Sequence, residues 1–289
     1  MREVEELCRG KLNLFLDVVG RRGDGFHELV TVFHEIDLAD ELVVRSWPDA
    51  PAPRSVRVRL LDGTIEADDV PRDARNLAAR AALRLLEQAG SDASVEIDIA
   101  KHIPSGAGLG GGSADAAGAL RAVNRLLDLD APPEELERIA ADVGSDVPFL
   151  VRGGTALGRG RGELLEPVPA AYGLRFVLLI PSFRIPTGEV FRALPNTLPP
   201  PVSPAALRRA LETGDVDGLM RSTHNALLSS AITVEPRLHR FLRHARAELG
   251  PHVQMTGSGS TLFVPWEGAR APDTGGWPFG ARALLVHSA

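Results

Sequence analysis

The sequence predicts a mixed fold of strands and helices, because patterns of both kinds occur along its 289 residues. Apolar and polar residues alternate over much of the first hundred residues, where glycine-rich turns predict hairpins. Five glycines within residues 106–112 then lead into an apolar helix. Residues 204–249 follow a helical pattern, and a glycine–serine turn between two short strands comes after them.

The predicted elements follow in chain order. In the first half we expect strands at 11–19, 26–36, 41–46, 55–61 and 94–100, and helices at 75–89, 116–127 and 133–142. In the second half we expect a hairpin over 153–168, strands at 175–180 and 281–287, a strand–turn–strand unit at 253–264, and helices at 205–212, 216–220, 225–230 and 234–249. Residues 195–204, with five prolines, are expected to form a loop, and residues 265–280 are left unassigned.

Composition limits the classes of function. A hydrophobic fraction of 44% and a charged fraction of 24% are typical of a soluble protein, and a net charge of -6 argues against a nucleic-acid partner. Cys8 is the only cysteine, and the eight histidines show no metal-ligand spacing, so no internal disulfide and no protein-held metal are expected. No signal peptide or apolar membrane span is recognisable. We expect a cytoplasmic protein without a membrane partner; the sequence leaves its oligomeric state open.

The glycine-rich loop is the stretch most indicative of function. Its glycines allow positive φ and a close approach of the backbone to a ligand. The helix expected at 116–127 follows directly, with Ser113 or Asp115 as its expected cap. Free amide hydrogens and the positive dipole end at a helix N-terminus favour phosphate. The sequence therefore predicts an anion site, and the phosphates of a nucleotide are its expected occupant.

Two common phosphate motifs fit this loop less well. Gly106, Gly108 and Gly111 match the spacing of the dinucleotide fingerprint, but the strand expected at 94–100 alternates polar with apolar residues. A central parallel strand buried on both faces would be nearly all apolar. No Gly-Lys-Ser/Thr follows the glycines, so the loop is not a Walker motif either.

Lysine is rare in this chain. Of the 32 lysine and arginine residues, only Lys11 and Lys101 are lysines. A lysine in such an arginine-rich chain suggests a position that needs a compact ammonium. In the strand expected at 11–19, alternation places Lys11 and Asn13 on the same face. Both side chains should therefore point toward the same surroundings.

The run from Pro104 through Gly108-Leu109-Gly110-Gly111-Gly112 to Ser113 resembles the phosphate loop of the GHMP kinases, which include galactokinase and the homoserine and mevalonate kinases. Similar blocks of that family occur at 11–16, 22–29, 144–149 and 255–260, in the expected order. The resemblance implies a two-domain α+β fold, with a mixed N-terminal half (1–155) that carries the nucleotide loop and a C-terminal half of sheet and helices (156–289). It also implies that the glycine turn at 255–260 lies against the phosphate loop.

The resemblance assigns roles to individual residues. ATP would be bound by the loop, with Mg2+ carried mainly by the phosphates and water rather than by a protein cage. Asp146 would be the general base, and Lys11 would orient it and offset charge on the γ-phosphate. The expected ATP-binding residues are Pro104, Ser105, Gly106, Ala107, Gly108, Leu109, Gly110, Gly111, Gly112, Ser113 and Ala114.

The N-terminal blocks are most similar to the branch of the family that phosphorylates a cytidylyl-linked polyol phosphate for isoprenoid precursors. That similarity implies that Lys11 and Asn13 face the acceptor hydroxyl, and that Phe26 and His27 hold the cytosine. A second ring is expected on the opposite face of the base, and Phe183 is the candidate. A homoserine- or mevalonate-type acceptor is the alternative, as is a non-catalytic nucleotide sensor on the same fold; a small acceptor would need no base clamp.

At one position the sequence departs from the family pattern: Ala114 stands where the family usually has a second serine, so a second hydroxyl at the phosphates is not expected.

Several of the other residues also have a simpler explanation. Asp146 could be only a turn or cap residue between a helix and a strand. Phe26 and Phe183 could pack within the protein, and His27 could be a solvated turn residue. The glycine–serine turn at 255–260 could belong to any hairpin.

Overall fold

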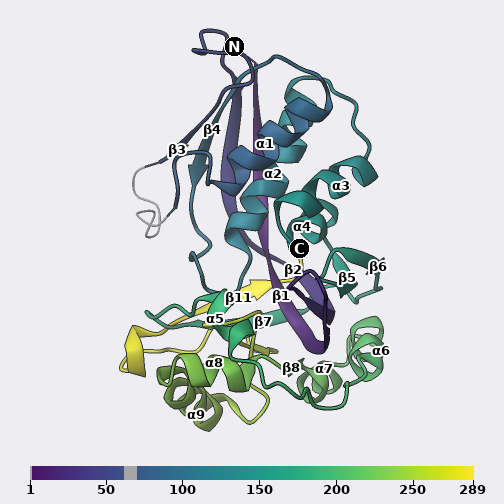
Figure 1. The fold of residues 1–289 in the computed structure, drawn as a ribbon. Coiled ribbons are helices and arrows are strands. Elements are labelled where there is room, and N and C mark those ends of the chain that lie inside the picture. Colours follow the sequence, from purple (N-terminus) through teal and green to yellow (C-terminus); the bar gives the residue numbers. More distant parts are fainter. Residues whose placement is uncertain (1, 62–69) are drawn as a thin grey trace. The chain divides into compact units, whose positions relative to one another are not determined.

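The computed structural model describes residues 2–61 and 70–289, which form two compact units. Of the described residues, unit 1 comprises 2–10, 38–61, 70–105 and 110–153, and unit 2 comprises 11–37, 106–109 and 154–289. The units are thus built from several chain segments each, and a domain boundary after residue 155 stays a prediction. Strands and helices are both abundant, so the α+β class is confirmed (Figure 1).

The sheet of unit 1 has β4 (Val95–Ala100) between two neighbours. It pairs antiparallel with residues 41–46 of β2 (His27–Ser46) and parallel with β3 (Val56–Leu60). Although β4 alternates in sequence, Glu96 and Asp98 are buried as well as its apolar residues. Asp98 is covered by salt bridges from Arg45 and Arg59, and these neutralise the polar face of the strand.

Four helices pack in unit 1 (Figure 1): α1 (Leu77–Gln88), α2 (Gly111–Leu126), α3 (Pro133–Val143) and α4 (Val147–Arg152). The side chain of Asn76 caps α1 by accepting from the amides of Ala78 and Ala79. Proline at the first position of α3 fits the fixed φ needed there. The buried faces of these helices are rich in alanine and leucine, which allows close packing.

Unit 2 contains part of the larger sheet, with strands β1, β2, β5, β6 and β8, and a smaller separate sheet. Residues 29–34 of β2 pair antiparallel with β5 (Thr155–Gly160), which pairs with β6 (Leu164–Pro167). In the same unit, β1 (Glu3–Arg21) pairs in parallel with the two-residue strand β8 (His224–Asn225) at Phe15 and Leu16. A separate antiparallel sheet has the order β11-β7-β10-β9. Its strands are β7 (Arg175–Ile180), β9 (Gln254–Met255), β10 (Leu262–Pro265) and β11 (Arg282–His287).

The helices of unit 2 are α5 (Thr187–Arg192), α6 (Ala205–Thr213), α7 (Val216–Ser222), α8 (Leu228–Val234) and α9 (Arg237–Leu249), with a short 3-10 helix at Pro278–Gly280. The core of the unit joins residues of β7 and β10 to the apolar faces of α8 and α9. Phe241 on α9 is completely buried there. This core supports the segments that carry the candidate site.

Several predicted boundaries were wrong. The strands expected at 26–36 and 41–46 are one strand, β2, and β1 extends from residue 3 rather than 11. Helix α2 begins at residue 111, not 116, so glycines expected in a loop lie in its first turn. The helix expected at 225–230 begins at 228, because His224 and Asn225 form β8. Helices α4 and α5 were not expected, whereas β7 has the expected bounds.

Candidate functional site

Lys11 and Asn13 lie on the same face of β1, as predicted. Lys11 Nζ donates to Asn13 Oδ1 at 2.6 Å and to the carbonyl oxygen of Gly108 at 3.0 Å. The amide group of Asn13 donates to Thr31 Oγ1 at 2.8 Å, and this hydroxyl donates to the carbonyl of Phe15. Lys11 and Asn13 are 3% and 2% exposed, so the ammonium is held in a buried polar network at the glycine loop.

The part of the glycine loop that belongs to unit 2, residues 106–109, lies directly on the turn at 255–260. The amide of Thr261 donates to the carbonyl of Ala107, and Gly108 has a φ of +81°. A Cβ at Gly108 would lie 2.5 Å from the carbonyl oxygen of Thr256, which no side chain could tolerate. The expected contact between turn and loop is confirmed, and it requires glycine at this position.

In unit 1 the loop continues into α2. Gly110 is the N-cap, with a φ of 78°, and as a glycine it makes no side-chain capping bond to the first turn. The expected cap by Ser113 or Asp115 is therefore wrong: Ser113 is the third helical residue and Asp115 the fifth. An uncapped glycine start leaves backbone amides of the first turn for a ligand. Pro104 and Ser105 precede this turn, and Ala114 is buried within it.

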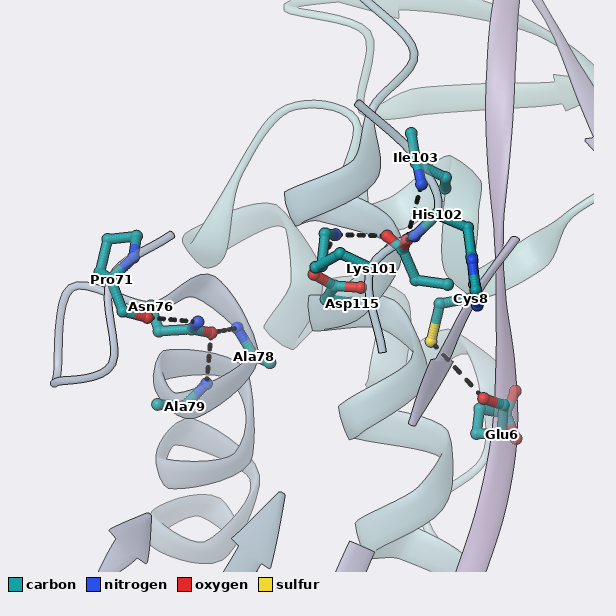
Figure 2. Close-up of polar contacts among 11 residues, drawn as sticks. Glu6, Cys8, Pro71, Asn76, Ala78, Ala79, Lys101, His102, Ile103 and Asp115 are labelled. Carbon is teal, nitrogen blue, oxygen red and sulfur yellow. Dashed lines mark hydrogen bonds and ion pairs between the residues drawn. The ribbon is translucent and has the colours of Figure 1, made fainter. Parts of the chain in front are cut away.

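A buried ionic cluster lies in unit 1 beneath the start of α2. Lys101 Nζ donates to Asp115 Oδ2 at 2.6 Å (Figure 2) and also to Asp40 Oδ2. The other oxygen of Asp40 accepts from the amides of His102 and Ile103, just before the glycine loop. The cluster therefore joins β2 and the end of β4 to α2.

Burial dominates the protonation of this cluster. Desolvation raises the pKa of Asp115 to about 7, although the Lys101 ammonium acts in the opposite direction. Burial by itself would lower the pKa of Lys101, but the charges of Asp115 and Asp40 outweigh it and raise that pKa. Two carboxylates share one ammonium, so ionising both would leave excess negative charge in the interior, and Asp115 keeps its proton up to a pKa of about 7.

Asp146 lies in unit 1 at the start of α4, where it is the N-cap residue and is half-buried. The expectation of a helix-to-strand turn was wrong, because α3 ends at Val143 and α4 follows. The Asp146 side chain makes no capping hydrogen bond to α4. The simpler explanation of this aspartate as a side-chain cap is therefore not supported.

Phe26 directly precedes β2 in unit 2, and His27 is the first residue of that strand. Phe26 is 49% exposed, and the guanidinium of Arg161 lies 4.8 Å from the centre of its ring. The His27 ring lies 5.2 Å from the ring of Phe191 on α5, centre to centre, at an interplanar angle of 32°. Nε2 of His27 is buried without a hydrogen-bond partner among the described residues. Such an atom fits a site that a ligand completes.

Phe183 does not have the surroundings expected of a ring that stacks on a base. It is 4% exposed and makes edge contacts with the rings of Phe241 and Phe279. The guanidinium of Arg237 lies 4.9 Å from its centre. The expectation for Phe183 is therefore corrected, because these neighbours cover the ring in the core of unit 2.

Sequence reasoning missed four residues of unit 2 that surround the candidate site. Thr31 could have been found, since alternation along β2 can be read from the sequence. Thr256 lies in a turn that was singled out, but its hydroxyl, which accepts from the amide of Asn13 at 2.9 Å, was not considered. Asn225 was assigned to a helix, and Phe191 was not distinguished from other aromatic residues.

No group of three or more potential metal-ligating side chains occurs within residues 2–61 and 70–289. Over the same residues, no helix has the length and apolar character needed to cross a membrane.

Comparisons with known proteins agree with this arrangement. The sequence model of the GHMP kinases N terminal domain matches residues 76–154. A 4-diphosphocytidyl-2-C-methyl-D-erythritol kinase from Heliobacterium modesticaldum is 40% identical over 277 residues, covering 89% of this chain and 84% of the relative. A kinase of the same name from Mycobacterium tuberculosis (strain H37Ra) is 40% identical over 280 residues, covering 94% of this chain and 85% of the relative.

Solved structures show the same fold. A crystal structure of 4-(cytidine 5'-diphospho)-2C-methyl-D-erythritol kinase superposes with a TM-score of 0.76 at 35% identity, covering 99% of this chain and 100% of the other. A homoserine kinase from Cytophaga hutchinsonii also gives a TM-score of 0.76, at 18% identity, covering 100% and 95%. The second likeness concerns the fold alone.

Proposed function

Because the chain belongs to the 4-diphosphocytidyl-2-C-methyl-D-erythritol kinase family of GHMP kinases, we propose that it transfers the γ-phosphoryl group of ATP to the 2-hydroxyl of that substrate. The hydroxyl oxygen forms a bond to the γ-phosphorus, the bond to the β–γ bridging oxygen breaks, and ADP leaves. The reaction contributes to the non-mevalonate synthesis of isoprenoid precursors. The identity of about 40% to relatives of this name favours this acceptor over homoserine or mevalonate.

The hydrogen bond from Lys11 Nζ to the carbonyl of Gly108 is the observation that carries the mechanism, because it brings a buried ammonium to the glycine loop. We propose that residues 104–114 hold the phosphates of ATP and that Lys11 stabilises charge on the transferred group. Asp146 is proposed as the general base that accepts the proton of the hydroxyl. The amide group of Asn13 orients the acceptor.

Magnesium is proposed to enter with ATP. Phosphate oxygens and water should supply most of its ligands, as is usual for Mg2+ bound with a nucleotide. When bound, Mg2+ would neutralise charge on the β- and γ-phosphates. We also propose a cytoplasmic location, where thiols such as that of the buried Cys8 stay reduced; recovery in a membrane or secreted fraction would contradict it.

For the cytosine, we propose Phe26, His27 and Phe191 as the recognition residues, with Phe191 in place of Phe183. The exposed Phe26 ring and the unpartnered Nε2 of His27 support this choice. Phe191→Ala should raise the KM for the cytidylyl substrate about 10-fold, as loss of one stacked ring is worth about 1–1.5 kcal/mol. The KM for ATP should not change. Phe183→Leu is the matched control: it should lower the melting temperature while both KM values stay the same. A raised KM for the cytidylyl substrate in Phe183→Leu, with no change in Phe191→Ala, would instead assign the stacking ring to Phe183.

The direct test is ADP formation with purified protein and a panel of acceptors that includes homoserine and mevalonate. We expect turnover only with the cytidylyl substrate. Asp146→Asn should reduce kcat by about 10^2 to 10^4-fold, the range for loss of a general base. Near-normal rates of this variant would remove Asp146 from its role, and turnover of homoserine alone would overturn the acceptor.

A further inference from the structure

Asn225 is a buried side chain whose hydrogen bonds all go to the backbone of unit 2. Its amide nitrogen donates to the carbonyls of Met255 at 2.7 Å and Gly257 at 2.9 Å. Its oxygen accepts from the amide of Leu227 at 2.9 Å. With 5% of its surface exposed, the planar amide group uses two donors and one acceptor in a single fixed position.

The turn that Asn225 holds lies against the residues that position Lys11. A Cβ on Gly257 would lie 3.0 Å from the carbonyl oxygen of Gly108 and 3.4 Å from Asn13 Oδ1, so no space separates the turn from either residue. The adjacent Thr256 accepts from the amide of Asn13 through its hydroxyl. The carbonyl of Gly108 in turn accepts from Lys11 Nζ.

Asn225 is also tied to the strand that carries Lys11. In β8 it stands opposite Leu16 of β1, and the amide of Ala226 donates to the carbonyl of Leu16 at 2.8 Å. Asn225, anchored on β8 and bonded to both Met255 and Gly257, therefore ties the turn to β1, in addition to the hydroxyl of Thr256.

We infer that Asn225 is a positioning residue of the kinase site: it presses the turn at 255–257 onto Gly108 and thereby fixes the carbonyl that holds the Lys11 ammonium. This inference rests on the proposed role of Lys11 and the glycine loop. Asn225 itself touches neither the phosphates nor the acceptor. The structure requires asparagine here, since leucine offers no hydrogen bond and aspartate offers only acceptors to two carbonyls.

The test is Asn225→Asp, which keeps the shape of the side chain but turns its two donors into an oxygen facing two carbonyls. The turn should move away from Gly108, with kcat about 10- to 100-fold lower and the KM for ATP about 10-fold higher, as expected when a positioned group is displaced. The KM for the cytidylyl substrate should stay within about 2-fold. Because a buried carboxyl resists ionisation, kcat should partly recover at pH 6 relative to pH 8.5, when the introduced group can again donate.

Asn124→Asp is the matched control. Asn124, near the end of α2, also accepts from a backbone amide and donates to a backbone carbonyl, both of Ala131. This variant should lower the melting temperature without changing kcat or either KM. Asn225→Ser keeps one donor without adding charge, and serves as a milder variant with a smaller effect in the same direction.

Two measurements separate this inference from the proposed function. If Asn225→Asp lowers only the melting temperature, as Asn124→Asp does, Asn225 is merely structural and the inference is overturned. Affinity for a non-hydrolysable ATP analogue, measured by calorimetry, tests the turn and loop without any acceptor. An approximately 10-fold weaker affinity in Asn225→Asp supports the inference even if the acceptor proves to be different, and an unchanged affinity contradicts it.

Discussion

The two lysines of this arginine-rich chain occupy contrasting surroundings in different units. Lys101, in unit 1, is 2% exposed and donates to the carboxylates of Asp40 and Asp115. Lys11, in unit 2, is 3% exposed and donates to the amide oxygen of Asn13 and a carbonyl of the glycine loop. Both places need a compact ammonium that reaches two acceptors at once, which a planar guanidinium would not fit.

The different partners of Lys11 and Lys101 indicate that the two lysines have separate roles. The cluster of Lys101 joins β2 and the end of β4 to α2 and supports the backbone just before the glycine loop (Figure 2). The network of Lys11 leads instead to the loop itself. We therefore expect substitution of Lys101 to affect mainly stability, and substitution of Lys11 to affect mainly the chemical step.

The largest effect on stability is expected from Lys101→Met. Removing the cation leaves Asp40 and Asp115 as uncompensated buried charges, which should cost about 3–5 kcal/mol of unfolding free energy. Urea unfolding would measure this loss. Adding Asp115→Asn to Lys101→Met should restore part of it, because one buried charge is then removed. A loss below about 1 kcal/mol would mean that the cluster around Lys101 contributes little to stability.

A smaller effect should appear in the pH dependence of stability. Since burial raises the pKa of Asp115 from 3.8 to about 7, folded protein holds a proton between these values that the unfolded chain has lost. The contribution of Asp115 to stability is therefore present below about pH 4, falls as pH rises to 7, and is constant above.

The Asp115→Asn variant isolates this contribution. Its unfolding free energy should be subtracted from that of the unsubstituted protein between pH 4 and 8. The difference should fall with pH by up to about 1.4 kcal/mol per unit, the value for one proton, and level off near pH 7. A difference that stays constant between pH 4 and 8 would show that Asp115 is ionised in the folded state well below pH 7.

Much of the candidate site follows from local patterns in the sequence. Alternation along β1 correctly placed Lys11 beside Asn13, because a strand directs every second side chain to the same face. Glycines 106 and 108 marked the loop, and both adopt positive φ. The bounds of β7 were also predictable, since a short apolar run that ends at proline leaves few alternatives.

Other features depend on packing that one sequence does not reveal. The gap between the strands expected at 26–36 and 41–46 contains the polar residue Asp40, which obscured the continuity of β2. Asp40 is nevertheless buried and accepts hydrogen bonds from the amides of His102 and Ile103. Local pattern could not distinguish Phe183 from Phe191, because the difference lies in which ring the core of unit 2 covers. The same holds for Asn225, whose partners lie some 30 residues further along the chain.

The catalytic role of Lys11 is tested most directly by single-turnover measurements of phosphoryl transfer in the Lys11→Met and Lys101→Met variants. Both substrates should be saturating, and the folded fraction of each variant should be determined in parallel. Lys11→Met should slow the step about 10^2 to 10^3-fold, the range for loss of one donor to transition-state charge, with most of the protein folded. The folded fraction of Lys101→Met should react within about 10-fold of the normal rate. Equal losses in the two variants, or a normal rate for Lys11→Met, would contradict the catalytic role assigned to Lys11.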